Sequence, residues 1–185
     1  ARERVSSPAR AAEILYAARD PFARKVMIDQ GLQAGIEAGR PVVDHVGVVG
    51  QVTRVYPWLS EVTLITDKGH LVPVMNVRTG LRAVLAGTGD EGKLELRFIP
   101  LAADFQKGDQ LVTSGIDGIY PPGLPVAEIT HVERNTAYLF ANISCKPLAG
   151  VHTHAQVLVL GPMPAKPERP EESESSPQKK RKKAG

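Results

Sequence analysis

Short apolar segments, separated by glycine, proline and polar turn residues, follow one another along the whole chain. In segments such as 94–99 (LELRFI) and 124–132, apolar side chains stand at every second position, which is the period of a strand with one buried face. About eleven such segments occur, with turn signals every ~8–12 residues and no convincing helix. The pattern predicts an all-β protein built as a sandwich or as a pair of small β-barrels.

Residues 107–133 are predicted to form a strand, a stiff loop and a second strand. Segment 114–123 holds three glycines and two prolines. In its Tyr120-Pro121-Pro122-Gly123 stretch, a proline presets φ and the glycine accepts a positive φ, which suits a type II turn. We interpret six residues as the ones that shape this loop: Gly108, Asp109, Gly115, Pro121, Pro122 and Gly123.

The basic charge of the chain belongs to its last twenty residues. From residue 166 onward there are seven Lys/Arg and four Asp/Glu, whereas residues 1–165 hold sixteen of each sign. The net charge of +3 is therefore no evidence for a nucleic-acid surface on the fold. Residues 161–185 are rich in Pro, Glu, Ser and Lys, and we expect a disordered, solubilising tail. The alternative is a tail that attracts anionic lipid or nucleic acid through KKRKK, at ~1 kcal/mol per basic residue near an anionic membrane.

The remaining composition limits the class of protein further. A single cysteine, Cys145, excludes an internal disulfide and a cysteine-based metal site. No apolar run approaches the ~20 residues of a membrane span, and nothing resembles a signal peptide. The chain starts without methionine, in the charged stretch ARERV, so we expect an excised fragment whose anchor or targeting segment would lie upstream.

A serine hydrolase is the main enzymatic alternative, because two small β-barrels also build the chymotrypsin-type proteases. Ser114 sits in a tight loop, and His45, His70, Asp44 and Asp67 are candidates for the other triad positions. Ser114 lacks the glycine context that such nucleophiles use, however, and a triad is defined by geometry. We expect no catalytic residue, and we expect Ser114 to close its own turn through its hydroxyl.

A zinc site is the other chemical alternative. His152 and His154 lie two apart, so on a strand they would face the same way. Further ligands would have to converge from elsewhere, with Asp44 or Asp104 as candidates. Exposed loop histidines are the simpler interpretation, and we expect neither a metal nor a cofactor.

Most aromatic residues stand at predicted strand positions, where we expect core packing: Tyr16, Phe22, Phe98, Phe105, Tyr138 and Phe140. The stretch Tyr56-Pro57-Trp58-Leu59 is different because it connects two strands, and tryptophan and tyrosine are enriched in binding hot spots. We therefore name Tyr56, Trp58 and Leu59 as candidate partner-binding residues. Tyr120, on its proline-stiffened loop, is a further candidate.

Several motifs resemble those of the MreC family of rod shape-determining proteins. The resemblance covers roughly residues 10–160, in order and at the expected spacing. It is carried by DPF (20–22), IDQG (28–31), GRPV (39–42), GVVGQV (47–52), SEVTLITD (60–67) and, above all, residues 108–126 with TSG and YPPGLPV.

The resemblance implies a fold and a role. MreC proteins are bacterial inner-membrane proteins with one membrane helix, a dimerising coiled coil and two small periplasmic β-barrels. Residues 1–9 would be the end of the coiled-coil linker. The family is not enzymatic. It scaffolds the elongation complex of side-wall peptidoglycan synthesis, contacts the elongation penicillin-binding transpeptidase, MreD and MreB, and forms homodimers and filaments.

The division between the barrels is predicted from chain order. Residues 10–79 are expected to pair with a returning segment, 135–160, as the first barrel, and 80–134 to form the second. Two consecutive barrels are the alternative. We expect such a module to bind through rigid loops and exposed strand edges.

Overall fold

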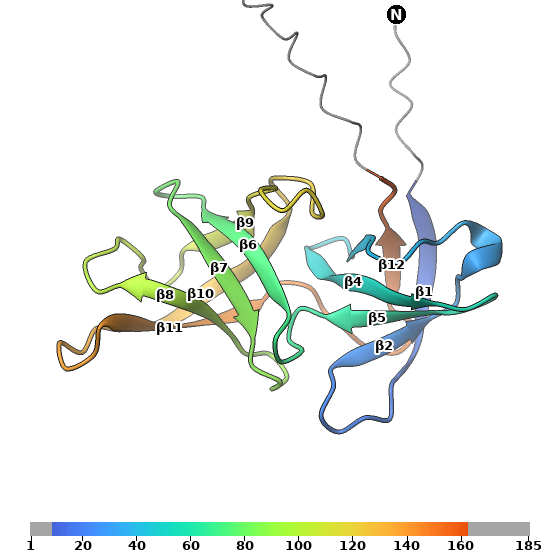
Figure 1. Cartoon of the computed structure of the whole chain (residues 1–185), viewed down its shortest axis with the longest axis horizontal. Coiled ribbons are helices and arrows are strands. Elements are labelled where there is room, and N and C mark those ends of the chain that lie inside the picture. The colour runs from blue at the N-terminus through green and yellow to red at the C-terminus, as the bar shows by residue number, and fades with distance from the viewer. Residues whose placement is uncertain (1–8, 163–185) are drawn as a thin grey trace, which may run out of the picture.

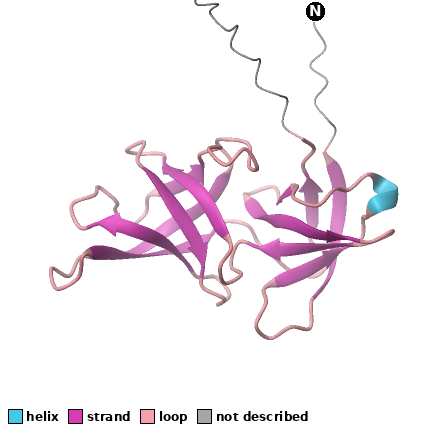
Figure 2. Cartoon of the chain, viewed as in Figure 1, coloured by secondary structure: helices cyan, strands magenta, loops and turns pink. Residues whose placement is uncertain are grey.

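Two β-barrels make up the structure, a computed structural model that describes residues 9–162 (Figures 1 and 2). The first barrel contains β1 (Arg10–Ala17), β2 (Lys25–Ile28), β3 (Pro41–Val43), β4 (Val48–Val55), β5 (Ser60–Leu64) and β12 (Gln156–Val159). The second contains β6 (Leu71–Asn76), β7 (Arg82–Gly87), β8 (Leu94–Pro100), β9 (Gln110–Thr113), β10 (Pro125–Glu133) and β11 (Phe140–Pro147). The 3-10 turn η1 (Leu32–Ala34) is the one helical element within the described range.

Each barrel is closed by antiparallel pairing around its full circumference. The order is β1-β12-β3-β4-β5-β2 in the first and β10-β11-β8-β7-β6-β9 in the second. Alternate residues of the strands are buried, as in β6 and β12, so each barrel has a side-chain core. The prediction of an all-β fold with two small β-barrels is confirmed, and each barrel has six strands. Residues 9–162 include no helix that is long and apolar enough to cross a membrane.

The expected boundaries between the barrels, after residues 79 and 134, are wrong because each would separate the two strands of one hairpin. β6 falls before residue 79 but pairs with β7 through the turn at Thr79–Gly80. β11 falls after residue 135 but pairs with β10. Only β12 returns to the first barrel, between β1 and β3. Residues 1–8 and 163–185, which hold most of the expected linker and tail, lie outside the described residues.

A tight turn at residues 44–47 separates β3 from β4. The Asp44 carboxylate accepts hydrogen bonds from the backbone N–H groups of Val46 and Gly47, each at 2.8 Å. A short polar side chain that binds the backbone two residues ahead stabilises a turn in competition with the ladder. The chain therefore reverses at this point.

Most aromatic side chains that were expected in the core are exposed. Phe105 is buried, but Tyr16, Phe22, Phe98, Tyr138 and Phe140 are on the surface. Phe98 shows why the strand period failed. In β8, Leu96 pairs with Ile143 and Ile99 pairs with Ala141, so two residues oppose one, which is a β-bulge. The extra residue turns Ile99 inward and leaves Phe98 73% exposed.

The two barrels share buried side chains. Val43, Val48 and Ile65, from the first barrel and the segment after it, belong to the same apolar cluster as the core of the second. Gly47 is buried, and a Cβ built on it would lie 2.6 Å from the carbonyl oxygen of Pro125 in β10. The close approach of the β3–β4 turn to β10 therefore depends on the missing side chain.

The stiff loop between β9 and β10 folds around Thr113. Its hydroxyl donates to the Pro121 carbonyl at 2.5 Å and accepts from the Leu124 N–H at 2.9 Å. Gly123 has a φ of 88°, as the expected turn requires.

At the other end of β9, the buried Asp109 carboxylate accepts hydrogen bonds from Asn76 Nδ2 (2.7 Å), Arg78 Nε (2.8 Å) and the Gln106 N–H (2.9 Å).

Replacing Gly47 by valine should destabilise the protein by about 1–3 kcal/mol, because the new side chain meets the Pro125 backbone and forces the barrels apart. Chemical denaturation measures the change. Gly150→Val is the matched control, since Gly150 is exposed, has no positive φ and has no atom near its virtual Cβ. Equal stability of the two variants would contradict the close barrel contact.

The contribution of Asp109 to stability should depend on pH. Hydrogen bonds from Arg78, outweighing the effect of burial, lower the pKa of Asp109 to about 2, with Asn76 and Gln106 adding to the effect. Because the folded pKa is below the unfolded one, the stabilisation of about 2 kcal/mol is present above pH 4 and is lost as the pH falls toward 2.

Denaturant titrations of the parent chain and Asp109→Asn should therefore differ at pH 7 and converge near pH 2. The exposed Asp90→Asn serves as the control and should track the parent chain at both values. A constant difference between Asp109→Asn and the parent over this range would mean that ionisation of Asp109 does not stabilise the fold.

Candidate partner-binding surface

The β4–β5 hairpin presents an aromatic tip at one end of the first barrel. Its turn is closed by a hydrogen bond from the Tyr56 N–H to the Leu59 carbonyl at 2.8 Å. The Trp58 side chain is 71% exposed, Tyr56 is also exposed, and Leu59 is half-buried. The structure thus brings together three of the four residues named from the sequence as candidate partner-binding positions.

The turn η1 supports this tip and adds a fourth apolar side chain. The N–H groups of Leu32 and Gln33 donate to the carbonyls of Tyr56 and Pro57 at 2.8 and 3.0 Å. Leu32 is 64% exposed and extends the apolar surface. We call Leu32, Tyr56, Trp58 and Leu59 the hairpin surface. Sequence reasoning missed Leu32 because the contact joins a loop to a turn more than twenty residues away.

Charged groups border the hairpin surface. Tyr56 and, to a lesser degree, Glu61 raise the pKa of Arg54, so its guanidinium remains charged. Lys25 and Glu61 form an ion pair at 3.4 Å on the neighbouring strands. An exposed indole held on a backbone-braced turn and bordered by charge has the composition of a protein–protein hot spot, in which Trp, Tyr and Arg predominate.

Tyr120 does not belong to a binding surface. Its side chain is 1% exposed, and its hydroxyl lies 2.9 Å from His70 Nε2. Asp117 explains the inward course of the loop, since its carboxylate accepts hydrogen bonds from the N–H groups of Ile119 and Tyr120. Burial raises the pKa of Tyr120 and lowers that of His70. The pair therefore packs the loop against the second barrel as neutral groups.

The structure does not assemble the residues considered for a catalytic triad. Ser114 Oγ accepts a long hydrogen bond from the Ile116 N–H at 3.5 Å, within its own turn. His70 is bound to Tyr120, and Asp67 accepts from the Arg24 N–H at 2.7 Å. Asp44 caps its own turn and binds the Gly150 N–H. Ser114, His70, Asp67 and Asp44 thus each have a separate structural partner.

No three potential metal ligands gather among residues 9–162. His154 Nδ1 lies 3.0 Å from Glu13 Oε1, while His152 stands in the adjoining loop without joining that pair. Burial raises the pKa of the Cys145 thiol to about 12, which keeps it protonated in the core.

Binding by strand addition, expected from the sequence, is contradicted for the described strands. Every strand of both barrels is paired on two sides, so no backbone edge is free to receive a partner strand. The described strands thus leave side chains and loops, and no strand edge, on the surface of the two barrels.

Tyr120→Phe should cost about 1 kcal/mol of folding stability, because it removes the hydrogen bond to His70 and leaves the ring packing intact. The denaturant midpoint measures this loss. Tyr138→Phe, at an exposed tyrosine, is the control and should leave the midpoint unchanged. A Tyr120→Phe variant as stable as the parent would show that the buried hydrogen bond is not stabilising.

The fold defines the class of this protein as an all-β module of two closed barrels. The chain belongs to the MreC family: the family described as "Rod shape-determining protein MreC, barrel core" matches residues 14–161. The cell shape-determining protein MreC of Haemophilus influenzae is 40% identical over 151 residues, which is 82% of this chain and 43% of the relative. These names confirm the expectation that the chain is not an enzyme.

Two solved structures show the same fold. The crystal structure of MreC from Pseudomonas aeruginosa is 37% identical, with a TM-score of 0.81 over 84% of this chain and 100% of that one. A complex of penicillin-binding protein PBP2 with MreC from Helicobacter pylori is 19% identical in its matching chain, with a TM-score of 0.59 over 83% and 98% of the two chains. The present chain spans less than half the length of the curated relatives from Haemophilus influenzae and Escherichia coli.

Proposed function

We propose that this chain is the partner-binding part of a scaffold that determines cell shape and binds the elongation penicillin-binding transpeptidase during side-wall peptidoglycan synthesis. Membership of the MreC family supports the scaffold role, and the complex of the Helicobacter pylori relative with PBP2 supports the class of partner. We propose the hairpin surface as the contact site because Trp58 is 71% exposed on a turn that backbone hydrogen bonds hold in place.

The proposed mechanism is selective binding. A rigid module regulates a transpeptidase if it binds one conformation of that enzyme better than another, and ~1–3 kcal/mol of differential affinity changes the populations several-fold or more. The closed barrels favour this mode, since a preformed surface loses little conformational entropy on binding.

The wider assembly is also a proposal. We infer that the whole protein lies on the periplasmic face of the bacterial inner membrane, with an anchor and a dimerising coiled coil outside this chain. MreD and MreB would be reached through those other segments, and self-association of the barrels would give filaments. The resemblance to the MreC family implies each of these inferences, and the match to the family's barrel core supports its application to this chain.

Titration against the periplasmic part of an elongation transpeptidase tests the function. Saturable binding should weaken tenfold or more in Trp58→Ala, or ~1.4 kcal/mol, because the indole is the largest exposed group of the hairpin surface. Phe22→Ala is the matched control: Phe22 is a 91% exposed aromatic of the same barrel, in the β1–β2 loop, and its loss should leave the affinity unchanged.

Two outcomes would count against the proposal. Binding that survives Trp58→Ala keeps the function but removes the hairpin surface from it. A complete absence of binding at high micromolar concentrations, to a dimerised form of the chain as well, rejects the transpeptidase as partner.

Deletion of residues 166–185 should leave the affinity unchanged, whereas a tail-driven binder would lose it.

A further inference from the structure

A second aromatic surface lies on the second barrel, and strand register explains its construction. Glu133 of β10 is directly opposite Asn142 of β11. On the other side of Asn142, β8 carries its bulge, where Phe98 is the extra residue. A carboxylate, a carboxamide and an aromatic ring thus follow one another across three strands of the outer face.

Phe98 adopts a backbone conformation that is unfavourable for phenylalanine. Its φ is 56°, in the left-handed region, where a bulky side chain is rare and glycine is favoured. The side chain is 73% exposed, so it contributes little to core packing that would offset this strain. Strained, exposed residues of this kind concentrate at binding sites.

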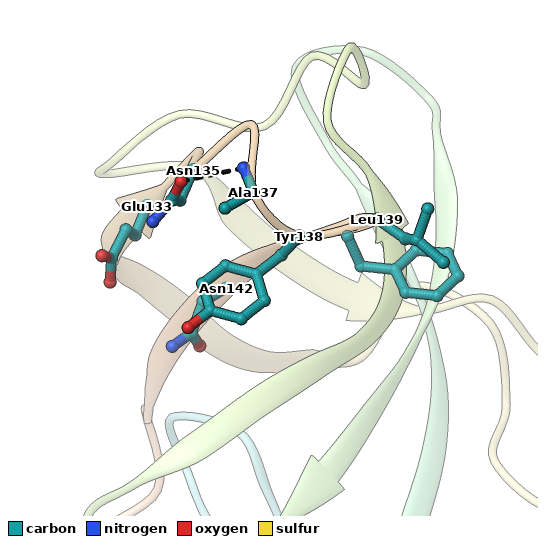
Figure 3. A pocket seen from close by; sticks show the side chains of 7 residues that line it. Glu133, Asn135, Ala137, Tyr138, Leu139 and Asn142 are labelled. Carbon is teal, nitrogen blue, oxygen red and sulfur yellow. Dashed lines mark hydrogen bonds between the residues drawn. The ribbon is translucent and has the colours of Figure 1, made fainter.

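An aromatic pair and a hollow adjoin this residue. The Phe98 and Phe140 rings meet edge to face, with centroids 5.7 Å apart. Beside them, the β10–β11 hairpin encloses an open hollow of about 630 Å³, lined by Glu133, Asn135, Ala137, Tyr138, Leu139, Phe140 and Asn142 (Figure 3). Pockets of 300–1,000 Å³ that combine apolar walls with a few polar groups are typical ligand sites.

Two polar side chains of the hollow, Glu133 and Asn142, have no side-chain partner among residues 9–162 and are available to a ligand. Glu133 has no cation within ion-pair distance, and the Asn142 carboxamide has no hydrogen bond there. The nearby arginines are engaged elsewhere. Arg134 donates to the carbonyls of Leu101, Ala103 and Phe105, and Arg97 pairs with Glu95 at 3.3 Å. A cationic ligand would therefore find the Glu133 carboxylate free.

We propose that this surface, Phe98, Tyr138, Leu139 and Phe140 with Glu133 and Asn142, binds an extended peptide segment of a partner protein. The segment would place a large apolar side chain against the Phe98–Phe140 pair and a lysine or arginine at Glu133. In an extended peptide, residues two apart share one side and are ~7 Å apart, a separation that suits neighbouring subsites on adjacent strands. Charge complementarity with Glu133 favours a basic peptide.

This peptide surface is distinct from the hairpin surface. The β10–β11 hairpin and the β4–β5 hairpin lie at opposite ends of the long axis of the molecule (Figure 1). The two surfaces can therefore be occupied at the same time, and the proposal does not depend on the identity of the transpeptidase.

Phage display of random dodecapeptides on the immobilised full chain tests the assignment. We expect enrichment of sequences that carry Trp, Phe or Leu two positions from Lys or Arg, and no such enrichment on Phe98→Gly. A synthetic peptide from the selection should bind at least tenfold more weakly to Phe98→Gly. It should lose its preference for Lys over Gln on Glu133→Gln. Leu71→Ala, at an exposed apolar residue of the same barrel, should leave the affinity unchanged.

Thermal unfolding separates a binding role from a structural one. Phe98→Gly and Phe98→Ala both remove the ring, but only glycine relieves the left-handed backbone, so the glycine variant should unfold at the higher temperature. It should also unfold no lower than the parent chain. A large drop in unfolding temperature for Phe98→Gly would make Phe98 a folding residue and overturn the proposal.

Other occupants are distinguishable in the same series. Selection of acidic peptides, or of none, rejects a basic peptide ligand. Concentration-dependent dimerisation that Phe98→Gly abolishes, without peptide enrichment, would assign the surface to a second copy of this chain. Cosedimentation with vesicles of phosphatidylglycerol and phosphatidylethanolamine that Leu139→Ala abolishes, again without enrichment, would assign it to a lipid surface.

Discussion

Closure of the first barrel by β12 is the constraint on which the rest of the architecture depends. β12 fills the gap between β1 and β3, with Arg10 opposite Val159 and Val43 opposite Leu158. Without it, two strand edges would be open and the buried side chains of Val157 and Val159 would be missing from the core. About 90 residues separate β5 from β12, and they form the whole second barrel. Because loop closure costs entropy, a second barrel that has already folded would shorten the effective loop.

Closure also determines how this module recognises partners. A closed barrel offers no backbone edge, so binding depends on side chains that the strands and turns hold in place. On the hairpin surface a reverse turn and two backbone hydrogen bonds from η1 fix Trp58. On the peptide surface a bulge fixes Phe98. In both cases the chain keeps large apolar groups in water, where they do not contribute to the cores.

Local chemistry explains which features the sequence could predict. Strand alternation indicated the all-β class, and the proline–glycine pattern indicated a positive φ at Gly123. The exposure of Tyr56 and Trp58 could be predicted because they stand in the turn between two strands. The failures came from distant contacts. Tyr120 is buried, and its hydroxyl is hydrogen-bonded to His70, fifty residues earlier in the chain. The exposure of Phe98 follows from pairing with β11, which a strict two-residue period in LELRFI cannot reveal.

The antiparallel pairing of β1 with β12 has a mechanical consequence. Since Arg10 is opposite Val159, the start of the first strand and the end of the last lie side by side. Tension between these two positions would load the β1–β12 hydrogen bonds one pair at a time, as in a zipper, and not all together in shear. The first barrel would open at this seam under a small load, before force reached the second barrel, whose strands lie between β5 and β12 in the chain. The second barrel and its surface would still be folded at that point.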